Sequence, residues 1–117
     1  MRLYRSTAKE WTEGRGYRKR TLLEQGQLGI EGSFIQEVCF KPGEGVPPHH
    51  HQKQTEIFYA LSRIEFEINE KRVLMAPGDI LVCEPGDIHG NPSMPEGARI
   101  LVLKKDYEEG DTIWHDR

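Results

Sequence analysis

The sequence of 117 residues is short of cysteine and has no long apolar run. Its two cysteines, Cys39 and Cys83, are too few for a disulfide framework and lack the Cys-x-x-Cys spacing of a redox or zinc motif, so we expect both thiols to be reduced. No apolar run approaches the roughly 18–20 residues that span a bilayer, and residues 1–5 are not followed by the apolar stretch of a secretory signal. We therefore expect a cytoplasmic protein with no membrane partner.

The sequence also lacks the excess of positive charge that nucleic-acid binding needs. It has 16 Lys and Arg against 19 Asp and Glu, a net charge of −3, so we expect no nucleic-acid partner. The charge is unevenly distributed: residues 1–20 hold seven bases against two acids, and residues 106–117 hold five acids against one base. This asymmetry predicts that the two ends attract each other, within one subunit or between two.

Glycine and proline divide the chain into short segments that favour an all-β barrel or sandwich. Residues 63–69 show the pattern best, because Ile64, Phe66 and Ile68 alternate with polar side chains and would bury one face of a strand. No window of a dozen residues carries a helical stripe, and the length fits one domain over residues 1–117. The expected strands are Ser33–Lys41, Glu56–Leu61, Arg63–Asn69, Arg72–Met75, Ile80–Cys83 and Arg99–Lys104.

Three of the five histidines are consecutive, at positions 49 to 51. Side chains alternate along a strand, so His49 and His51 project to one side and His50 to the other. Glu56 can return to the first side at the start of the next strand, and a turn after residues 80–83 would place His89 there as well. Three imidazoles and one carboxylate suit Mn, Fe, Co, Ni, Cu or Zn, with one or two coordination positions left open.

These residues belong to two spaced motifs. The motifs read Gly43-x5-His49-x-His51-x4-Glu56 and Gly78-x7-Gly86-x2-His89, and about fourteen residues separate position 63, where the first motif closes, from the second motif. They resemble the two signature motifs of the cupin superfamily. The resemblance implies a single conserved antiparallel β-barrel of the jelly-roll type over about residues 30–105, with an N-terminal arm (1–20) and an acidic C-terminal tail (106–117). It also implies that His49, His51, Glu56 and His89 bind a divalent transition metal.

The sequence departs from the cupin motifs at three places. Arg63 stands where a glycine usually closes the first motif, so the turn after residues 61–62 must form without glycine or shift in register. Glu84 precedes Pro85-Gly86 and is a candidate for an extra carboxylate near the rim of the pocket. Ser93 replaces an expected asparagine, with Asn91 nearby. None of the three is at a ligand position.

Two further residues are candidates for contact with a small-molecule ligand. Gln36 lies on the same face of its strand as three apolar residues, which predicts one amide in an apolar barrel lining. Phe58 shares its face with Glu56 and would shape the cavity. Without a ligand, a buried amide bonded to the backbone would explain Gln36, and core packing would explain Phe58.

Two functions are compatible with such a site. The first is a small metalloenzyme of the dioxygenase or isomerase type that acts on a small polar molecule. The second is a non-catalytic module that binds a sugar or an acid through the metal. Small cupins commonly dimerise, and residues 3–11, with Tyr4 and Trp11, offer apolar side chains for exchange between two subunits, so a homodimer is expected.

Overall fold

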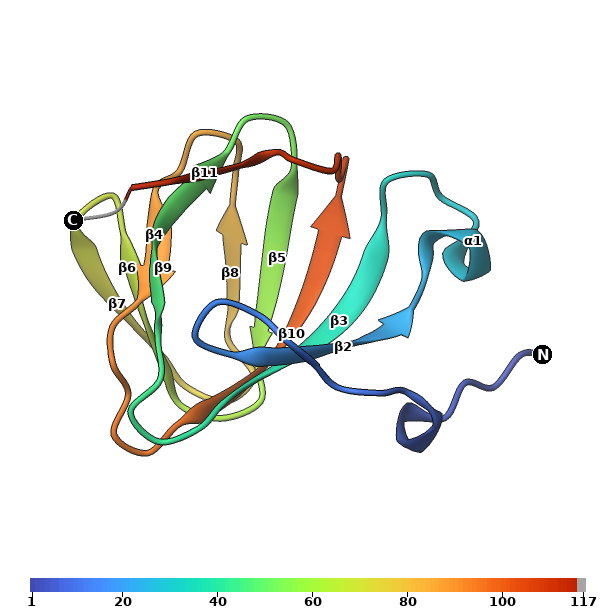
Figure 1. Ribbon diagram of the computed structural model, residues 1–117, viewed down its shortest axis with the longest axis horizontal. Coiled ribbons are helices and arrows are strands. Elements are labelled where there is room, and N and C mark those ends of the chain that lie inside the picture. Colours follow the sequence, from blue (N-terminus) through green and yellow to red (C-terminus); the bar gives the residue numbers. More distant parts are fainter. Residues whose placement is uncertain (116–117) are drawn as a thin grey trace.

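The computed structural model describes residues 1–115 as an all-β structure (Figure 1). Asp116 and Arg117, the last residues of the expected acidic tail, lie outside the described residues. The elements are η1 (Ser6–Ala8), β1 (Thr12–Glu13), β2 (Arg18–Leu23), α1 (Gln25–Leu28), β3 (Phe34–Phe40), β4 (Val46–His51), β5 (Thr55–Ala60), β6 (Ile64–Ile68), β7 (Lys71–Met75), β8 (Ile80–Cys83), β9 (His89–Asn91), β10 (Ala98–Lys105) and β11 (Thr112–Trp114).

The strands form two antiparallel sheets that face each other (Figure 1). One sheet has the order β1-β2-β3-β10-β5-β8, and the other has the order β11-β4-β9-β6-β7. In Figure 1, β11 crosses the open end of the barrel above β5 and β8. Within residues 1–115, no helix is long and apolar enough to cross a membrane.

The alternating segments of the sequence become the central strands. All six expected strands are present, each within two residues of its predicted ends. Their inward faces form one apolar core between the sheets. The buried apolar residues are Val38, Phe40, Val46, Phe58, Ala60, Ile64, Phe66, Met75, Cys83, Met94, Ala98, Ile100 and Val102. Neither cysteine is disulfide-bonded in the structure, and Cys83 is the more deeply buried of the two.

Both ends of the chain contribute to the sheets. The strand β2 pairs with β3 through Arg20 and Glu37, and β11 pairs with β4, so the sheets include residues outside the range of 30–105 expected for the barrel. The two ends meet where the guanidinium of Arg15 lies 4.4 Å from the ring centroid of Trp114. A cation over the face of an indole is attracted to it. The two ends therefore meet within one chain at this contact, and the attraction between their opposite charges stays a prediction.

A close approach between β4 and β9 requires glycine. A Cβ atom on Gly90 would lie 2.7 Å from the carbonyl oxygen of Val46, which is too close for any side chain. The absence of a side chain lets the β9 backbone pack against β4, and His89 pairs directly with His49 across the two strands. Glycine at this position thus brings the second motif against the first.

A buried carboxylate ties three strands together on the outer face of the six-stranded sheet. The Glu37 side chain is 4% exposed. It accepts hydrogen bonds from Arg20 Nε on β2 at 2.7 Å and from the Arg99 guanidinium on β10. Burial by itself raises the pKa of a carboxyl group, but the hydrogen bonds from Arg99 and Arg20 outweigh it and hold the pKa of Glu37 below its ordinary value.

We expect Glu37→Gln to lower the free energy of unfolding by about 1–3 kcal/mol, because the neutral amide leaves two guanidinium groups without a counter-charge. A carboxyl group with a lowered pKa in the folded state stabilises the protein above its unfolded pKa, and this contribution is lost as the pH falls through the folded pKa. The wild type should therefore lose stability on acidification more steeply than the variant, as measured by urea unfolding of metal-free protein between pH 3 and pH 7.

A matched control is Glu108→Gln. Glu108 pairs with Lys53 on the surface, where both side chains are more than half exposed. Exposed pairs contribute little to stability. An equal loss of stability in the two variants would contradict the role given to Glu37.

Candidate metal centre

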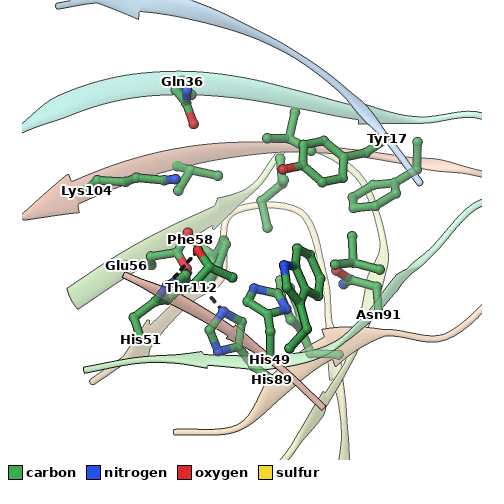
Figure 2. Close-up of a pocket in the computed structure, with 17 residues that line it drawn as sticks. Tyr17, Gln36, His49, His51, Glu56, Phe58, His89, Asn91, Lys104 and Thr112 are labelled. Carbon is green, nitrogen blue, oxygen red and sulfur yellow. Dashed lines mark hydrogen bonds and ion pairs between the residues drawn. The ribbon is translucent and has the colours of Figure 1, made fainter. Parts of the chain in front are cut away.

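Four side chains from both sheets converge at one end of the barrel. His49 and His51 lie on β4 and His89 on β9, whereas Glu56 comes from β5 in the other sheet. One ligand atom from each residue lies within 4.8 Å of the ligand atoms of the other three (Figure 2). All four side chains are buried at this site. The structure thus brings together the four residues that the motif spacing singled out.

The Glu56 carboxylate is the centre of this group. Its Oε1 lies 2.7 Å from His51 Nε2 and 3.1 Å from His89 Nε2. The His49 ring centroid lies 4.3 Å from that of His89 and 5.2 Å from that of His51. As strand alternation predicts, His50 faces the other way, and its Nδ1 lies 2.6 Å from Nε2 of the half-buried His115.

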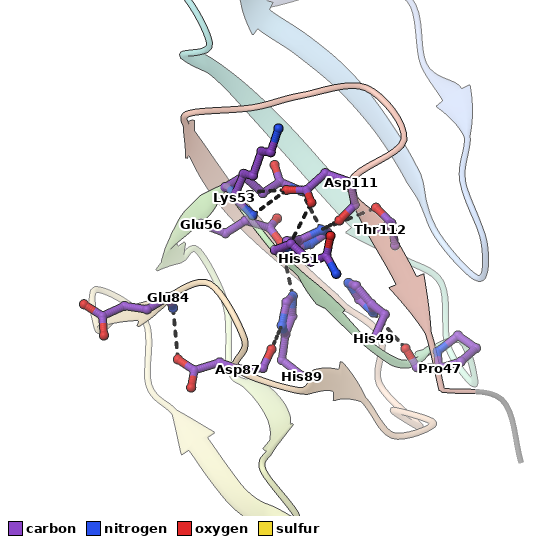
Figure 3. Close-up of polar contacts among 12 residues, drawn as sticks. Pro47, His49, His51, Lys53, Glu56, Glu84, Asp87, His89, Asp111 and Thr112 are labelled. Atoms are coloured by element: carbon purple, nitrogen blue, oxygen red, sulfur yellow. Dashed lines mark hydrogen bonds and ion pairs between the residues drawn. The ribbon is translucent and has the colours of Figure 1, made fainter.

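Backbone carbonyls hold the far side of each imidazole. His49 Nδ1 lies 2.9 Å from Pro47 O, His89 Nδ1 lies 3.0 Å from Asp87 O, and His51 Nδ1 lies 3.2 Å from Asp111 O (Figure 3). A carbonyl oxygen only accepts, so in these three contacts Nδ1–H is the donor. The remaining Nε2 lone pairs then face one another and the carboxylate, an arrangement that a bound cation would stabilise.

Gln54 supports His51 from behind the site. The Gln54 side chain is 2% exposed, and its amide lies 2.6 Å from His51 Nδ1. Its Oε1 has no hydrogen-bond partner, and neither has His51 Nε2 despite its short distance to Glu56. If the Gln54 amide is turned over, Gln54 Oε1 accepts a hydrogen bond from His51 Nδ1–H. His51 Nε2 then keeps a free lone pair. The orphaned His51 Nε2 is therefore consistent with a metal-ligating His51.

Burial and mutual charge set the protonation states. Burial and the nearby His89 lower the pKa of His49 to about 4, so this imidazole is neutral at neutral pH. Burial disfavours the charged form of Glu56, but the contacts from His51 and His89 outweigh it and hold the pKa of Glu56 well below its ordinary value. A neutral imidazole and an ionised carboxylate are the forms that bind metal.

A cavity of about 100 Å³ opens next to the four side chains. Both candidates for ligand contact, Gln36 and Phe58, line it, and apolar residues such as Phe66 and Ile100 form much of its wall. The Trp114 ring on β11 packs against His49 at a centroid distance of 4.7 Å. The cavity wall is therefore mixed: apolar residues form much of it, the four converging side chains lie on one side, and Gln36 and Lys104 lie on another.

The family of the chain follows from a match to a family model. Residues 36–103, which include all four converging residues, match the model described as the cupin domain. The chain belongs to the cupin family. This match and the two antiparallel sheets confirm the predicted jelly-roll barrel.

Solved structures of other cupin-like proteins share the fold at low sequence identity. The polyketide cyclase RemF from Streptomyces resistomycificus has a TM-score of 0.82 and 21% identity, over 100% of this chain and 87% of that chain. The nucleoside dehydratase Pac13 from Streptomyces has a TM-score of 0.76 and 16% identity, over 98% of this chain and 91% of that chain. These likenesses concern the fold alone.

One curated relative matches in sequence. The oxidoreductase OpS7 from Beauveria bassiana (strain ARSEF 2860) is 40% identical over 47 residues. The match covers 38% of this chain and 15% of OpS7, so the cupin chain spans a small part of that relative's length.

The three departures from the cupin motifs leave the site intact. Arg63 does not adopt a positive φ, so the bend forms without glycine. Beside it, Ser62 Oγ accepts a hydrogen bond from the backbone N–H of Arg99. Glu84 does not line the cavity, so the expectation of a carboxylate at the rim is wrong; its backbone N–H donates to Asp87 and its side chain points away (Figure 3). Ser93 donates to Gly43 O outside the cavity, and the nearby Asn91 lines it.

The lining residues that were not predicted from the sequence include Tyr17, Lys104, Thr112 and Trp114. Lys104 had a usable signal, because it shares the parity of the buried Ile100 and Val102 along β10. Burial lowers the pKa of Lys104, the charge of Glu56 opposes this shift, and Lys19 adds to it. The other three come from the terminal segments, whose short strands β1, β2 and β11 carry no clear alternation.

The side chain of Asp111 fixes the segment that covers the site. It accepts hydrogen bonds from the backbone N–H groups of Gln52, Lys53 and Gln54 at 2.9–3.0 Å, while its own carbonyl accepts from His51. This cap joins the loop after β4 to the start of β11.

We expect Asp111→Ala to speed hydrogen exchange at amides 52–54 and along β11, because three N–H groups lose a charged acceptor. Amide exchange followed by mass spectrometry or NMR measures this effect. Glu109→Ala, which removes an exposed acid from the same segment, should leave these rates unchanged. Equal rates in the Asp111 variant and the wild type would show that other contacts hold the segment.

Proposed function

We propose that the protein is a metal-dependent enzyme in which His49, His51, Glu56 and His89 bind one divalent transition metal. The observation that carries the proposal is the convergence of four buried ligand atoms within 4.8 Å beside a cavity. The donor set of three imidazoles and one carboxylate suits Mn, Fe, Co, Ni, Cu or Zn. The carbonyl contacts at Nδ1 support the same reading, because they direct each Nε2 lone pair to a common point.

When bound, a metal with these ligands polarises an oxygen atom of a bound molecule and lowers the pKa of coordinated water. The protein supplies the rest of the environment. Phe58, Phe66 and Ile100 exclude water from one wall, which strengthens electrostatic interactions inside the cavity. The hydroxyl of Tyr17, whose pKa is raised by burial and by the charge of Glu56, stays protonated and offers a hydrogen bond to the bound molecule.

We propose a reaction of the isomerase type, without net transfer of electrons, on a small oxygen-bearing molecule. The named activities of two proteins with this fold, a cyclase and a nucleoside dehydratase, support this class over dioxygenation. The oxidoreductase name of OpS7 carries less weight, since the match covers 15% of that protein. A non-catalytic module that holds an acid or a sugar is the outcome if no chemistry is found.

We expect the purified wild type to bind about one transition metal ion per chain, and His49→Ala and Glu56→Gln to bind it at least about tenfold more weakly. Elemental analysis and titration with Co²⁺ measure the effect. His50→Ala is the matched control, because His50 is the next residue on β4 and faces away from the cavity. Equal metal content in the wild type and the three variants would contradict the assignment of the metal ligands.

The reaction class has a separate test. The test uses a panel of small keto and hydroxy acids. With one of these substrates, the metal-loaded protein should catalyse exchange of solvent deuterium into the carbon atoms next to the carbonyl group. The exchange rate should be the same with and without oxygen. NMR in deuterated buffer reads this exchange. Oxygen consumption coupled to turnover would favour the dioxygenase type, and binding without exchange would favour the non-catalytic module.

A further inference from the structure

Lys104 is a cation directed into the barrel. It lies on the inward face of β10, where its Cα pairs with that of Phe34 on one side and that of Glu56 on the other. Its Nζ lies 5.6 Å from the ring centroid of Phe34 and 5.4 Å from that of Tyr107. These two rings contact each other edge to face and enclose the lysine at one end of the cavity. The aromatic faces hold the ammonium group but do not neutralise it.

No carboxylate among residues 1–115 forms an ion pair with Lys104. Its neighbour Lys105, which points outward, pairs loosely with Asp106 at 3.7 Å. Glu56 is adjacent in register to Lys104 but directs its Oε1 to His51 and His89. The charge of Glu56 acts on Lys104, but a bound metal would take up that charge. A largely buried ammonium group without a counter-charge is costly, so the metal-loaded site would call for an anionic partner beside Lys104.

The charges around the cavity also favour an anionic ligand. In Figure 2, Lys104 and Gln36 lie across the cavity from His49 and His89, with the nitrogen of Lys104 directed inward. With a divalent cation at the four ligands, Glu56 cancels one positive charge, so one remains at the metal and one on Lys104. Both act in a cavity of low dielectric constant, where they attract an anion strongly.

We propose that Lys104 is the residue that selects the substrate, and that the site takes a small carboxylate that bridges the metal and the Lys104 ammonium group. This inference rests on the proposed metal centre and names its substrate class. Gln36 lines the same wall, and its Nε2 lies 3.5 Å from Thr21 Oγ1; with the amide turned over, the Thr21 hydroxyl would donate to Oε1 and the amide N–H would face the second carboxylate oxygen. The enclosed cavity of about 100 Å³ is smaller than the roughly 150 Å³ that holds a benzene molecule, so the enclosed part of the ligand has fewer than about six heavy atoms.

A matched pair of probes tests the charge requirement. Glycolate and glycolamide have the same size and the same hydroxyl group, and they differ in the charge of one end. Binding is read from the visible absorption of Co²⁺-loaded protein, after the metal content of each sample has been measured. The variants are Lys104→Met, Lys104→Arg and the control Lys105→Met, which removes the same charge from the outside of the same strand.

Wild type and Lys105→Met should prefer glycolate over glycolamide by the same factor, and Lys104→Met should reduce that preference about tenfold or more. Lys104→Arg should retain most of it, which also separates loss of charge from loss of folding. Equal preference in wild type and Lys104→Met at equal metal content would overturn the role of Lys104. Absence of bound Co²⁺ from the wild type would instead overturn the metal centre.

Discussion

The site depends on the cost of burying the Glu56 carboxylate between two sheets. An ionised carboxyl group loses several kcal/mol of hydration when it is buried, and it persists only where hydrogen bonds or positive charge replace the water. Here two imidazole nitrogens approach the same carboxylate oxygen. The other nitrogen of each imidazole donates to a backbone carbonyl. Burial lowers the pKa of His89, but the hydrogen bond and charge of Glu56 outweigh it and raise that pKa, so without metal a proton on His89 meets the carboxylate, and a bound cation would take the place of this proton.

The Glu56 carboxylate adds a group from the opposite sheet to the three histidines. Glu56 is the member of the group that comes from the six-stranded sheet, whereas His49, His51 and His89 come from the five-stranded sheet. A metal bound by all four would therefore tie the sheets together across the open end of the barrel. Because such binding acts on the folded state, part of its free energy would add to the stability of the barrel. This explains how a chain with a modest apolar content can leave a polar cavity in its centre.

The sequence predicts the fold and the convergence of the four side chains because both rest on short spacings. Alternation along a strand separates His49 and His51 from His50, and two motifs with fixed spacing locate Glu56 and His89. The parts that the sequence does not predict depend on long-range pairing. Trp114 reaches the site through the pairing of β11 with β4, and no local pattern in residues 112–114 indicates this partner.

The register of β3 and β10 determines which side chains of the six-stranded sheet face outward and which face the cavity. Glu37 on β3 pairs with Leu101 on β10 and is held from outside by Arg99, while the next residue, Gln36, faces the cavity. A slip of one residue between these strands would turn Lys104 outward and place an apolar side chain at the cavity wall. The buried ion cluster at Glu37 opposes that slip, since its two guanidinium groups come from the strands on either side. The ion cluster on the outer face of the sheet thus helps to fix the position of Lys104 on the inner face.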